Sequence, residues 1–341
     1  MTNAKNLLSA RYIAILAGLA ILLILPFFIT SNYIIAVLVN CMAFAVFAVA
    51  WNIIGGYGNQ VSWASAAFVA VGAYTNFIMA IQFGISPFLS LPIGMVLSYA
   101  LATFIGYGSF RLRGAYFAIA TIAFAEAFRS IIQIRQLREV TRGTIGLFIT
   151  YRGNDFWRLS FSNDRPFYYM FIVLLALSLL FCNWFVKSKT GYYLSCIKGD
   201  EDAAESLGIE TFKIKLRAFQ ASAVMMSVGG AFYASFLTFI SPASTASFNL
   251  SIMIGIAAII GGVGTLWGPV LGAFIIVPLI EIAGILLGAA GASNVLYGLL
   301  LVVMVMFRPG GLITFLYALR DKIRKRAMSK QSAAGGKGGV T

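Results

Sequence analysis

The chain contains no histidine and only three cysteines among its 341 residues, and both shortages narrow the possible functions. Without histidine, the usual near-neutral general base and the commonest metal ligand are missing. Cys41 and Cys182 lie in apolar runs and Cys196 in a charged one, so no disulfide framework is visible. No Ser or Cys nucleophile has an evident base beside it, and no cluster of Cys and carboxylates has the spacing of a metal site. We therefore expect no catalytic residues, no metal and no cofactor.

Charge is also scarce, because charged residues make up 11% of the chain against about 25% in soluble domains. Hydrophobic residues make up 60%, and the mean hydropathy is +0.90. The net charge of +14 would suggest a nucleic-acid partner in a soluble chain, but in a membrane protein it indicates positive charge kept on the cytoplasmic side. We predict an all-α polytopic membrane protein, embedded in lipid and without a nucleic-acid partner.

About ten transmembrane helices are predicted, at about 20 residues per crossing. The first is interpreted as a retained helix and not as a cleaved signal peptide, because its apolar run continues to Ile29 without a small-residue cleavage pattern. The eighth and tenth are short enough to be tilted, broken or re-entrant. The predicted spans are Tyr12–Ile29, Tyr33–Ile54, Ala64–Ile81, Pro87–Tyr107, Ala115–Ile132, Phe167–Val186, Ala218–Ile240, Leu250–Ile260, Val270–Leu287 and Ser293–Phe307.

The distribution of Lys and Arg places the N- and C-termini in the cytoplasm by the positive-inside rule. With Lys5 and Arg11 inside, the short connection carrying Arg111 and Arg113 also falls inside. Four connections without Lys or Arg fall outside, namely residues 30–32, 82–86, 241–249 and 288–292. Residues 133–166 fall outside despite six arginines, but the rule applies weakly to a long segment of mixed sign.

On this topology, residues 1–320 form one transmembrane domain and residues 321–341 a basic, disordered cytoplasmic tail. The domain carries an inner segment at 187–217, which is cytoplasmic, and an outer segment at 133–166, which is extracytoplasmic. Both names are kept below.

The inner segment is the only well-charged stretch between transmembrane helices. Its centre, Asp200–Gly208, is predicted to form a short helix, because early acidic residues complement the helix dipole. Two alanines in this helix would allow close approach of a soluble partner, which could then transmit force into the membrane. The residues assigned to this coupling role are Asp200, Glu201, Asp202, Ala203, Ala204, Glu205, Leu207 and Gly208.

Ionisable residues inside spans are rare and mark candidate transport paths. Glu126 and Arg129 are three residues apart, so they share a helix face and can pair. We expect the pair to face the bundle interior, where it either fixes helix packing or meets a zwitterionic substrate. Glu281, near the middle of its span, could cap a broken helix, line the path or meet Arg129. Gln60 and Ser62, at the start of the third span, could bond across helices or satisfy backbone at a break.

The outer segment contains Thr141–Leu147, in which two glycines lie among small polar residues. This composition favours a tight, partly ordered turn. The turn is either a solvated connector or a surface for a partner, and Thr141, Arg142, Gly143 and Thr144 are the candidate contacts.

Glycine occurs 34 times and forms two similar clusters, Gly55–Gly58 and Gly261–Gly264, each preceded by two isoleucines. On the predicted topology both clusters lie at cytoplasmic ends of helices that run in the same direction. Such pairs indicate either internal repeats that frame a pathway or simple close packing of helices. There is no Gly-x-x-x-x-Gly-Lys-Ser/Thr loop, so we expect no ATP hydrolysis by this chain.

These motifs resemble the permeases of ABC importers, and more specifically the branched-chain amino-acid permease family, LivM type. Asp202-Ala203-Ala204 followed by Gly208 is similar to the cytoplasmic EAA loop of such permeases, with Asp in place of the first Glu. The segments that carry the closer resemblance follow the family's order along the chain, namely Gly58–Thr75, Arg111–Thr121 with Glu126 and Arg129, Thr141–Leu147, Gly261–Ala273, Tyr297–Leu299 and Arg308–Leu312.

The resemblance implies an ABC importer permease fold in the bacterial inner membrane, with four kinds of partner or substrate. These are two ABC ATPase subunits, a second and related permease in a heterodimer, an extracytoplasmic substrate-binding protein, and the substrates leucine, isoleucine and valine. The chain departs from the family at Ala64-Ser65, where Gly-His is usual, and at Arg142 and Ile145 in the outer motif. Urea, short amides or aromatic acids therefore stay as alternative substrates, and an ion-coupled secondary transporter as the alternative class.

Overall fold

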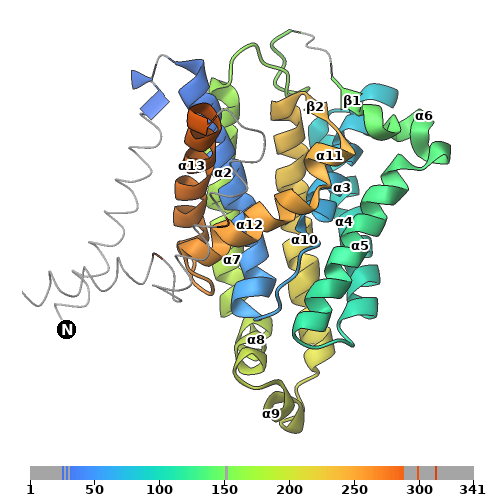
Figure 1. Ribbon diagram of the computed structural model, residues 1–341, viewed down its shortest axis with the longest axis vertical. Helices are drawn as coiled ribbons and strands as arrows, with labels where there is room; N and C mark the ends of the chain where they lie inside the picture. Colours follow the sequence, from blue (N-terminus) through green and yellow to red (C-terminus); the bar gives the residue numbers. More distant parts are fainter. Residues whose placement is uncertain are drawn as a thin grey trace, which may run out of the picture.

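The computed structural model describes residues 25–26, 28–29, 31–149, 153–287, 298 and 312, which form a bundle of long helices (Figure 1). Within these residues, seven segments are long and apolar enough to cross a membrane. They are α2 (Asn32–Asn52) continued by the π-helical turn η1 (Ile53–Tyr57), α3 (Ser65–Gln82), α4 (Pro87–Ser109), α5 (Ala115–Gln133), α7 (Arg165–Lys187), α11 (Pro242–Thr245) with α12 (Phe248–Gly261), and α13 (Gly268–Leu287). The multi-span helical class predicted from the sequence is confirmed.

An eighth long helix, α10 (Thr211–Leu237), has 27 residues and so spans about 40 Å. It is less apolar than the seven because its first turns carry Lys213, Lys215 and Arg217, and it packs against α2, α3 and α4. Its polar side chains have partners there: Gln220 donates to Thr103 Oγ1 at 2.8 Å, and Ser222 donates to the Ala50 carbonyl at 2.7 Å. The predicted span Ala218–Ile240 is thus present, but the helix begins earlier, inside the inner segment.

The contact between α3 and α10 depends on glycine at both sides. A methyl group at Gly72 would overlap the Ser227 carbonyl, and one at Gly230 would overlap the Val69 carbonyl. A buried hydrogen bond links the same two helices: the Asn76 amide nitrogen on α3 donates to Ser235 Oγ on α10 at 2.8 Å. The two helices therefore form a fixed pair at the centre of the bundle.

The helix α2 is buried on all sides from Cys41 to Gly56 and lies among α7, α10, α12 and α13. A helix that is apolar all round is typical of such an interior position. By contrast, α4 and α5 expose large apolar side chains along one face, among them Leu89, Val96 and Tyr116. The bundle thus has a protein-filled centre around α2 and α10 and an apolar flank at α4 and α5.

The connections gather at two opposite ends of the bundle (Figure 1). One end, here called the α9 end, carries α8 (Lys189–Gly199), α9 (Glu201–Ser206) and the turn at residues 110–114. The other, here called the sheet end, carries strand β1 (Leu147–Phe148) paired antiparallel with β2 (Phe239–Ile240), and the short elements η2 (Arg135–Leu137), α6 (Arg138–Thr141) and η3 (Gly143–Ile145). Inner and outer segments thus lie at opposite ends, as predicted.

The eighth predicted span, Leu250–Ile260, lies within α12, which has only 14 residues, or about 21 Å. Ala246 and Ser247 separate α12 from the short helix α11, which lies in the predicted connection 241–249. Figure 1 shows α12 lying obliquely across the long helices. Seven other predicted spans correspond to α2, α3, α4, α5, α7, α10 and α13. The first and tenth predicted spans lie largely outside the described residues, and so does the tail 321–341.

Candidate functional site

The predicted short helix of the inner segment is α9, which projects from the bundle at the α9 end (Figure 1). Asp200 caps its N-terminus, because its side chain accepts a hydrogen bond from the Ala203 backbone nitrogen at 3.0 Å. Glu201 and Asp202 follow in the first turn, where negative charge complements the helix dipole. The helix ends before Gly208, whose φ of +81° is in the left-handed region that favours glycine.

Three carboxylates of the inner segment attach α9 to the bundle. Glu201 forms an ion pair of 2.6 Å with Lys215 on α10, whose side chain is only 2% exposed. Asp202 forms an ion pair of 2.7 Å with Arg113, in the turn after α4. This hydrogen bond raises the pKa of the Arg113 guanidinium above its usual value. The third carboxylate, Glu205, accepts from the Thr211 hydroxyl at 2.6 Å. These contacts link α9 to α10 and to the α4–α5 turn.

The two alanines of α9 have different roles, which corrects the sequence prediction that both face a partner. Ala204 is 2% exposed and packs against the protein's own core. Ala203 is exposed, and Leu207 beyond it is 82% exposed. A side chain built at Gly208 would meet no atom within 4 Å. The free face of α9 is thus formed by Ala203, Leu207 and Gly208.

The two glycine clusters meet at the α9 end, as their predicted positions require. The Asn52 side chain joins them: it accepts from the Gly264 backbone nitrogen and donates to the Thr265 carbonyl, both at 2.8 Å. Lys198 of α8 donates to the Gly56 carbonyl at 2.7 Å. A side chain at Gly56 would overlap Asn52, so the glycine is required for this junction. Sequence reasoning missed Asn52 and Lys198, because neither is near its partner along the chain.

The polar break before α3 satisfies backbone groups, one of the two roles predicted for it. The Ser62 carbonyl accepts from Trp51 Nε1 at 2.7 Å, and Ser62 itself is buried. The Ala66 nitrogen donates to Ser251 Oγ on α12 at 2.9 Å. Gln60 is partly exposed, and its backbone nitrogen donates to the Ile54 carbonyl at 3.1 Å. Hydrogen bonds at the break therefore join α2, α3 and α12.

Glu126 and Arg129 form the predicted ion pair, at 3.1 Å. The prediction that they face the interior of this bundle is wrong, because their side chains are 53% and 31% exposed. The buried residues of α5 are Phe117, Thr121, Ala125 and Ile132, and Arg129 borders this buried stripe because it lies one turn after Ala125. Glu126 thus lies on the open flank of α5 and Arg129 at its edge, within a span that is otherwise apolar.

Glu281 on α13 does not meet Arg129, which is paired with Glu126. Its carboxylate accepts one hydrogen bond from the Tyr33 hydroxyl, at the long distance of 3.4 Å. Glu281 also lines a partly open cavity between α2, α10, α12 and α13.

The four candidate contacts of the outer segment divide into two groups. Thr141 and Gly143 are buried, and the Thr141 hydroxyl donates to the Ile132 carbonyl at 2.8 Å. Arg142 and Thr144 are exposed at the sheet end. Thr141 and Gly143 therefore hold the turn, and only Arg142 and Thr144 are free to contact a partner. The turn is ordered, as predicted, since β1 continues from it into the pairing with β2.

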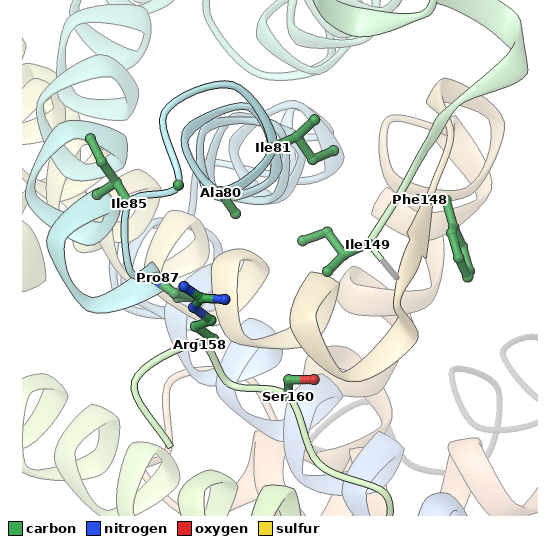
Figure 2. Close-up of a pocket in the computed structure, with 9 residues that line it drawn as sticks. Ala80, Ile81, Ile85, Pro87, Phe148, Ile149, Arg158 and Ser160 are labelled. Atoms are coloured by element: carbon green, nitrogen blue, oxygen red, sulfur yellow. The ribbon is translucent and has the colours of Figure 1, made fainter. Parts of the chain in front are cut away.

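A second hollow at the sheet end, of about 190 Å³, was not predicted from the sequence. It lies between the α3–α4 turn, β1 and the loop that carries Arg158 and Ser160. In Figure 2, Ile149 and Ala80 point toward the hollow, and Phe148 lies on the far side of β1. Its walls are mostly apolar, and Arg158 pairs with Asp155 at 3.7 Å.

The structure defines a multi-span helical membrane protein with a capped, ion-paired helix at one end. Residues 33–305 match the family described as branched-chain amino acid transport system, permease component. This match covers more than half of the chain, and the chain belongs to this family.

Relatives of known function agree with the assignment. The high-affinity branched-chain amino acid transport system permease protein LivM of Escherichia coli is 28% identical over 320 residues, which is 87% of this chain and 74% of the relative. The LivM protein of Salmonella typhimurium is also 28% identical, over 88% of this chain and 74% of its own length. A probable LivH permease of Methanocaldococcus jannaschii is 27% identical, over 73% of this chain and 79% of the relative. No solved structure matches the chain.

Proposed function

We propose that this chain is the membrane-spanning permease subunit of an ABC importer for leucine, isoleucine and valine. Two separate ATPase subunits supply the energy, an extracytoplasmic binding protein supplies the substrate, and a second, related permease completes the membrane part. The observation that carries the proposal is α9, whose free face ends in the 82% exposed Leu207. An exposed leucine beside a small alanine fits a groove on a soluble partner, because an apolar anchor in a pocket is a common centre of an interface.

The attachments of α9 support a coupling role. The buried Glu201–Lys215 pair fixes α9 to α10, the helix at the centre of the bundle. Lys198 fixes the adjoining α8 to the end of α2 at Gly56. A partner that moves α8 and α9 by a short distance therefore acts on two central helices at once, since packed elements shift as units.

The proposed orientation follows from the same end of the molecule. The α9 end faces the cytoplasm, the sheet end faces outward, and both termini are cytoplasmic in a chain of about ten spans in the inner membrane. The basic residues of the inner segment and of the α4–α5 turn, including Arg111 and Arg113, support this orientation by the positive-inside rule.

Assembly with a second permease accounts for the charge pair on α5. An ionised pair exposed within a membrane span is costly against lipid, so it faces protein or a water-filled path. The Glu126 carboxylate lies on the open flank of α5, and Arg129 lies at the edge of that flank. We therefore place the second permease against α5. The binding protein docks on the sheet end, at Arg142 and Thr144.

The substrate proposal rests on the family and on its relatives, which are branched-chain amino acid transport permeases. Urea, a short amide or an aromatic acid is the alternative substrate, and an uptake assay with labelled leucine separates these choices. Valine competes with labelled leucine under the proposal, whereas urea does not. If the cognate binding protein ignores leucine and takes urea or an aromatic acid instead, the substrate assignment fails and the coupling argument stands.

The experiment that tests coupling replaces the exposed end of α9 by a charge. Leu207→Asp should reduce leucine uptake by about tenfold or more, because an interface anchor contributes on this scale. The variant should reach the membrane in normal amount, since Leu207 has almost no contacts within the chain. The matched control is Leu207→Met, which keeps an apolar side chain of similar volume at the same position and should transport normally. Normal uptake and normal association of the ATPase in Leu207→Asp would contradict the proposal.

A further inference from the structure

A cavity of about 280 Å³ lies between four helices, away from the open flank of α5. Ligand pockets in proteins have volumes of about 300–1,000 Å³, so this one suits a molecule of the size of a single amino acid. The broken α11–α12 segment forms one wall, and α2, α10 and α13 form the others. Among the described residues, its lining includes Asn40, Leu250, Met253, Val277, Ile280 and Glu281.

Two hydrogen-bond acceptors of this cavity lack adequate donors. The side-chain oxygen of Asn40 is buried and has no hydrogen-bond partner among the described residues. The Glu281 carboxylate has no cationic partner in the same part of the chain, and its one donor, the Tyr33 hydroxyl, is 3.4 Å away. A buried amide oxygen without a donor is rare in proteins, and so is a carboxylate without a cation in a membrane span, so the two groups in one cavity indicate a ligand.

The chemistry of the missing ligand follows from these acceptors. A primary ammonium group carries one positive charge and three N–H donors, and it therefore satisfies a carboxylate and an amide oxygen together. Beside these acceptors, Leu250, Met253, Val277 and Ile280 form an apolar wall. We propose that the cavity binds the primary ammonium group of a small aliphatic molecule, with Glu281 and Asn40 as its acceptors.

The first turn of α12 completes the site for an amino acid. Ser247 caps this 14-residue helix by accepting from the Leu250 nitrogen at 3.2 Å, and both residues line the cavity. The N-terminus of a helix carries partial positive charge and favours a carboxylate. Broken helices of transporters place such ends at their substrate sites. An aliphatic amino acid thus finds a place for its ammonium group, its carboxylate and its side chain in one cavity.

The Glu126–Arg129 pair is a poorer candidate for this role, although the sequence favours it. Its two charges already neutralise each other at 3.1 Å. A zwitterion that binds there has to break that pair first. Glu281 needs no such rearrangement, because it has no cation to release within the described residues.

Two sources carry the same ligand chemistry, and the experiment distinguishes them. One is the transported amino acid, an assignment that rests on the proposed function; the other is the amine headgroup of a phospholipid. The first measurement is binding of labelled leucine to the full permease complex in nanodiscs without binding protein. Glu281→Gln preserves shape and should weaken leucine binding by about tenfold or more, since a charge-assisted hydrogen bond is lost. The control Glu139→Gln removes one exposed acid at the sheet end and should bind normally.

The second measurement tests the cavity without requiring leucine binding. Met253→Cys, with Cys41, Cys182 and Cys196 replaced by serine, places one thiol in the wall of the cavity. An aminoethyl methanethiosulfonate, which is cationic, should modify this thiol several-fold faster than the anionic sulfonatoethyl reagent, because Glu281 attracts the cation. Adding Glu281→Gln should abolish the preference. Equal rates for the two reagents with Glu281 present would overturn the ammonium site.

The outcomes separate the site from the proposed function. Protection of the thiol by leucine assigns the site to the transported amino acid. An aminophospholipid that co-purifies with the unsubstituted protein and is lost in Glu281→Gln assigns it to the lipid headgroup. If Glu281→Gln changes neither leucine binding nor the reagent preference and leucine uptake persists, the site is refuted and the proposed function stands. Failure of the complex and its binding protein to take leucine refutes the proposed substrate, while the reagent preference still supports the site.

Discussion

The α9 end and the Glu281 cavity use the same kinds of side chain in opposite ways. At the α9 end each carboxylate has a partner within about one hydrogen-bond length: Glu201 has Lys215, Asp202 has Arg113, and Glu205 has Thr211. In the cavity, the only donor to Glu281 among the described residues is the Tyr33 hydroxyl, at 3.4 Å, and the Asn40 side-chain oxygen has no donor there.

This difference distinguishes contacts that fix the position of α9 from polar groups that are left to bind a ligand. Groups that satisfy one another fix the geometry of two elements, which suits the transmission of force through packed helices. Groups that are left unsatisfied lower the stability of the empty protein and favour a ligand that supplies the missing partner. Stability measurements on the two regions should therefore move in opposite directions when the charges are removed.

The largest effect should come from Ala204→Arg. Ala204 is 2% exposed, so the substitution places a charge without a partner inside the packed base of α9, which costs several kcal/mol. We expect the variant to disappear from the membrane fraction. Ala203→Arg, one residue earlier on the free face, should accumulate normally and lose uptake. A stable Ala204→Arg protein, detected at normal amounts by immunoblotting, would show that α9 packs differently.

The next effect should come from the buried ion pair of α9. Lys215→Met leaves Glu201 without its partner and should destabilise the protein by about 3–5 kcal/mol. The double variant Glu201→Gln with Lys215→Met should recover much of this loss, because no charge then remains unpaired. A thermal-shift series on the purified complex measures both effects. Additive losses in the double variant would argue against a direct pair.

A smaller effect of opposite sign should come from Glu281→Gln. Because Glu281 has no cationic partner in the described structure, removing its charge should leave the stability of the ligand-free protein unchanged or raise it by about 1 kcal/mol. Leucine should then stabilise the unsubstituted protein and fail to stabilise the variant. A clear drop in the melting temperature of ligand-free Glu281→Gln would mean that the carboxylate has a structural partner.

The smallest effect should come from Asp202→Asn. The pair of Asp202 with Arg113 is exposed, with side-chain exposures of 76% and 57%, and exposed ion pairs contribute little because water and salt screen them. The melting temperature should not change measurably. Uptake should weaken most at high salt, where the remaining contacts at the α9 end are screened too. A large loss of stability would show that this pair is shielded in the assembled transporter.

The sequence was sufficient to predict what depends on local pattern. Apolar blocks of about 20 residues located the spans, and the acidic start with Gly208 located α9, because hydropathy and helix capping act within a few residues. The presence of a pair at Glu126 and Arg129 followed from their spacing.

The sequence could not predict what depends on packing between distant helices. Nothing near Ala204 distinguishes it from Ala203, since their different burial arises from the fit of α9 against the core. The contact of Asn52 with Gly264 and that of Lys198 with Gly56 join residues far apart in the chain. Asn40 carries no signal of its own in an apolar helix, and only the cavity identifies it.

The central claim is that a separate ATPase docks on α9, and crosslinking from Leu207 tests it most directly. A photoreactive amino acid at position 207, with the whole transporter expressed in its native membrane, should give an adduct that contains the ATPase subunit. The same residue at Phe83, which is exposed at the opposite sheet end, should give none. An ATPase adduct from Phe83, or its absence from position 207 in a complex that still transports, would contradict the account.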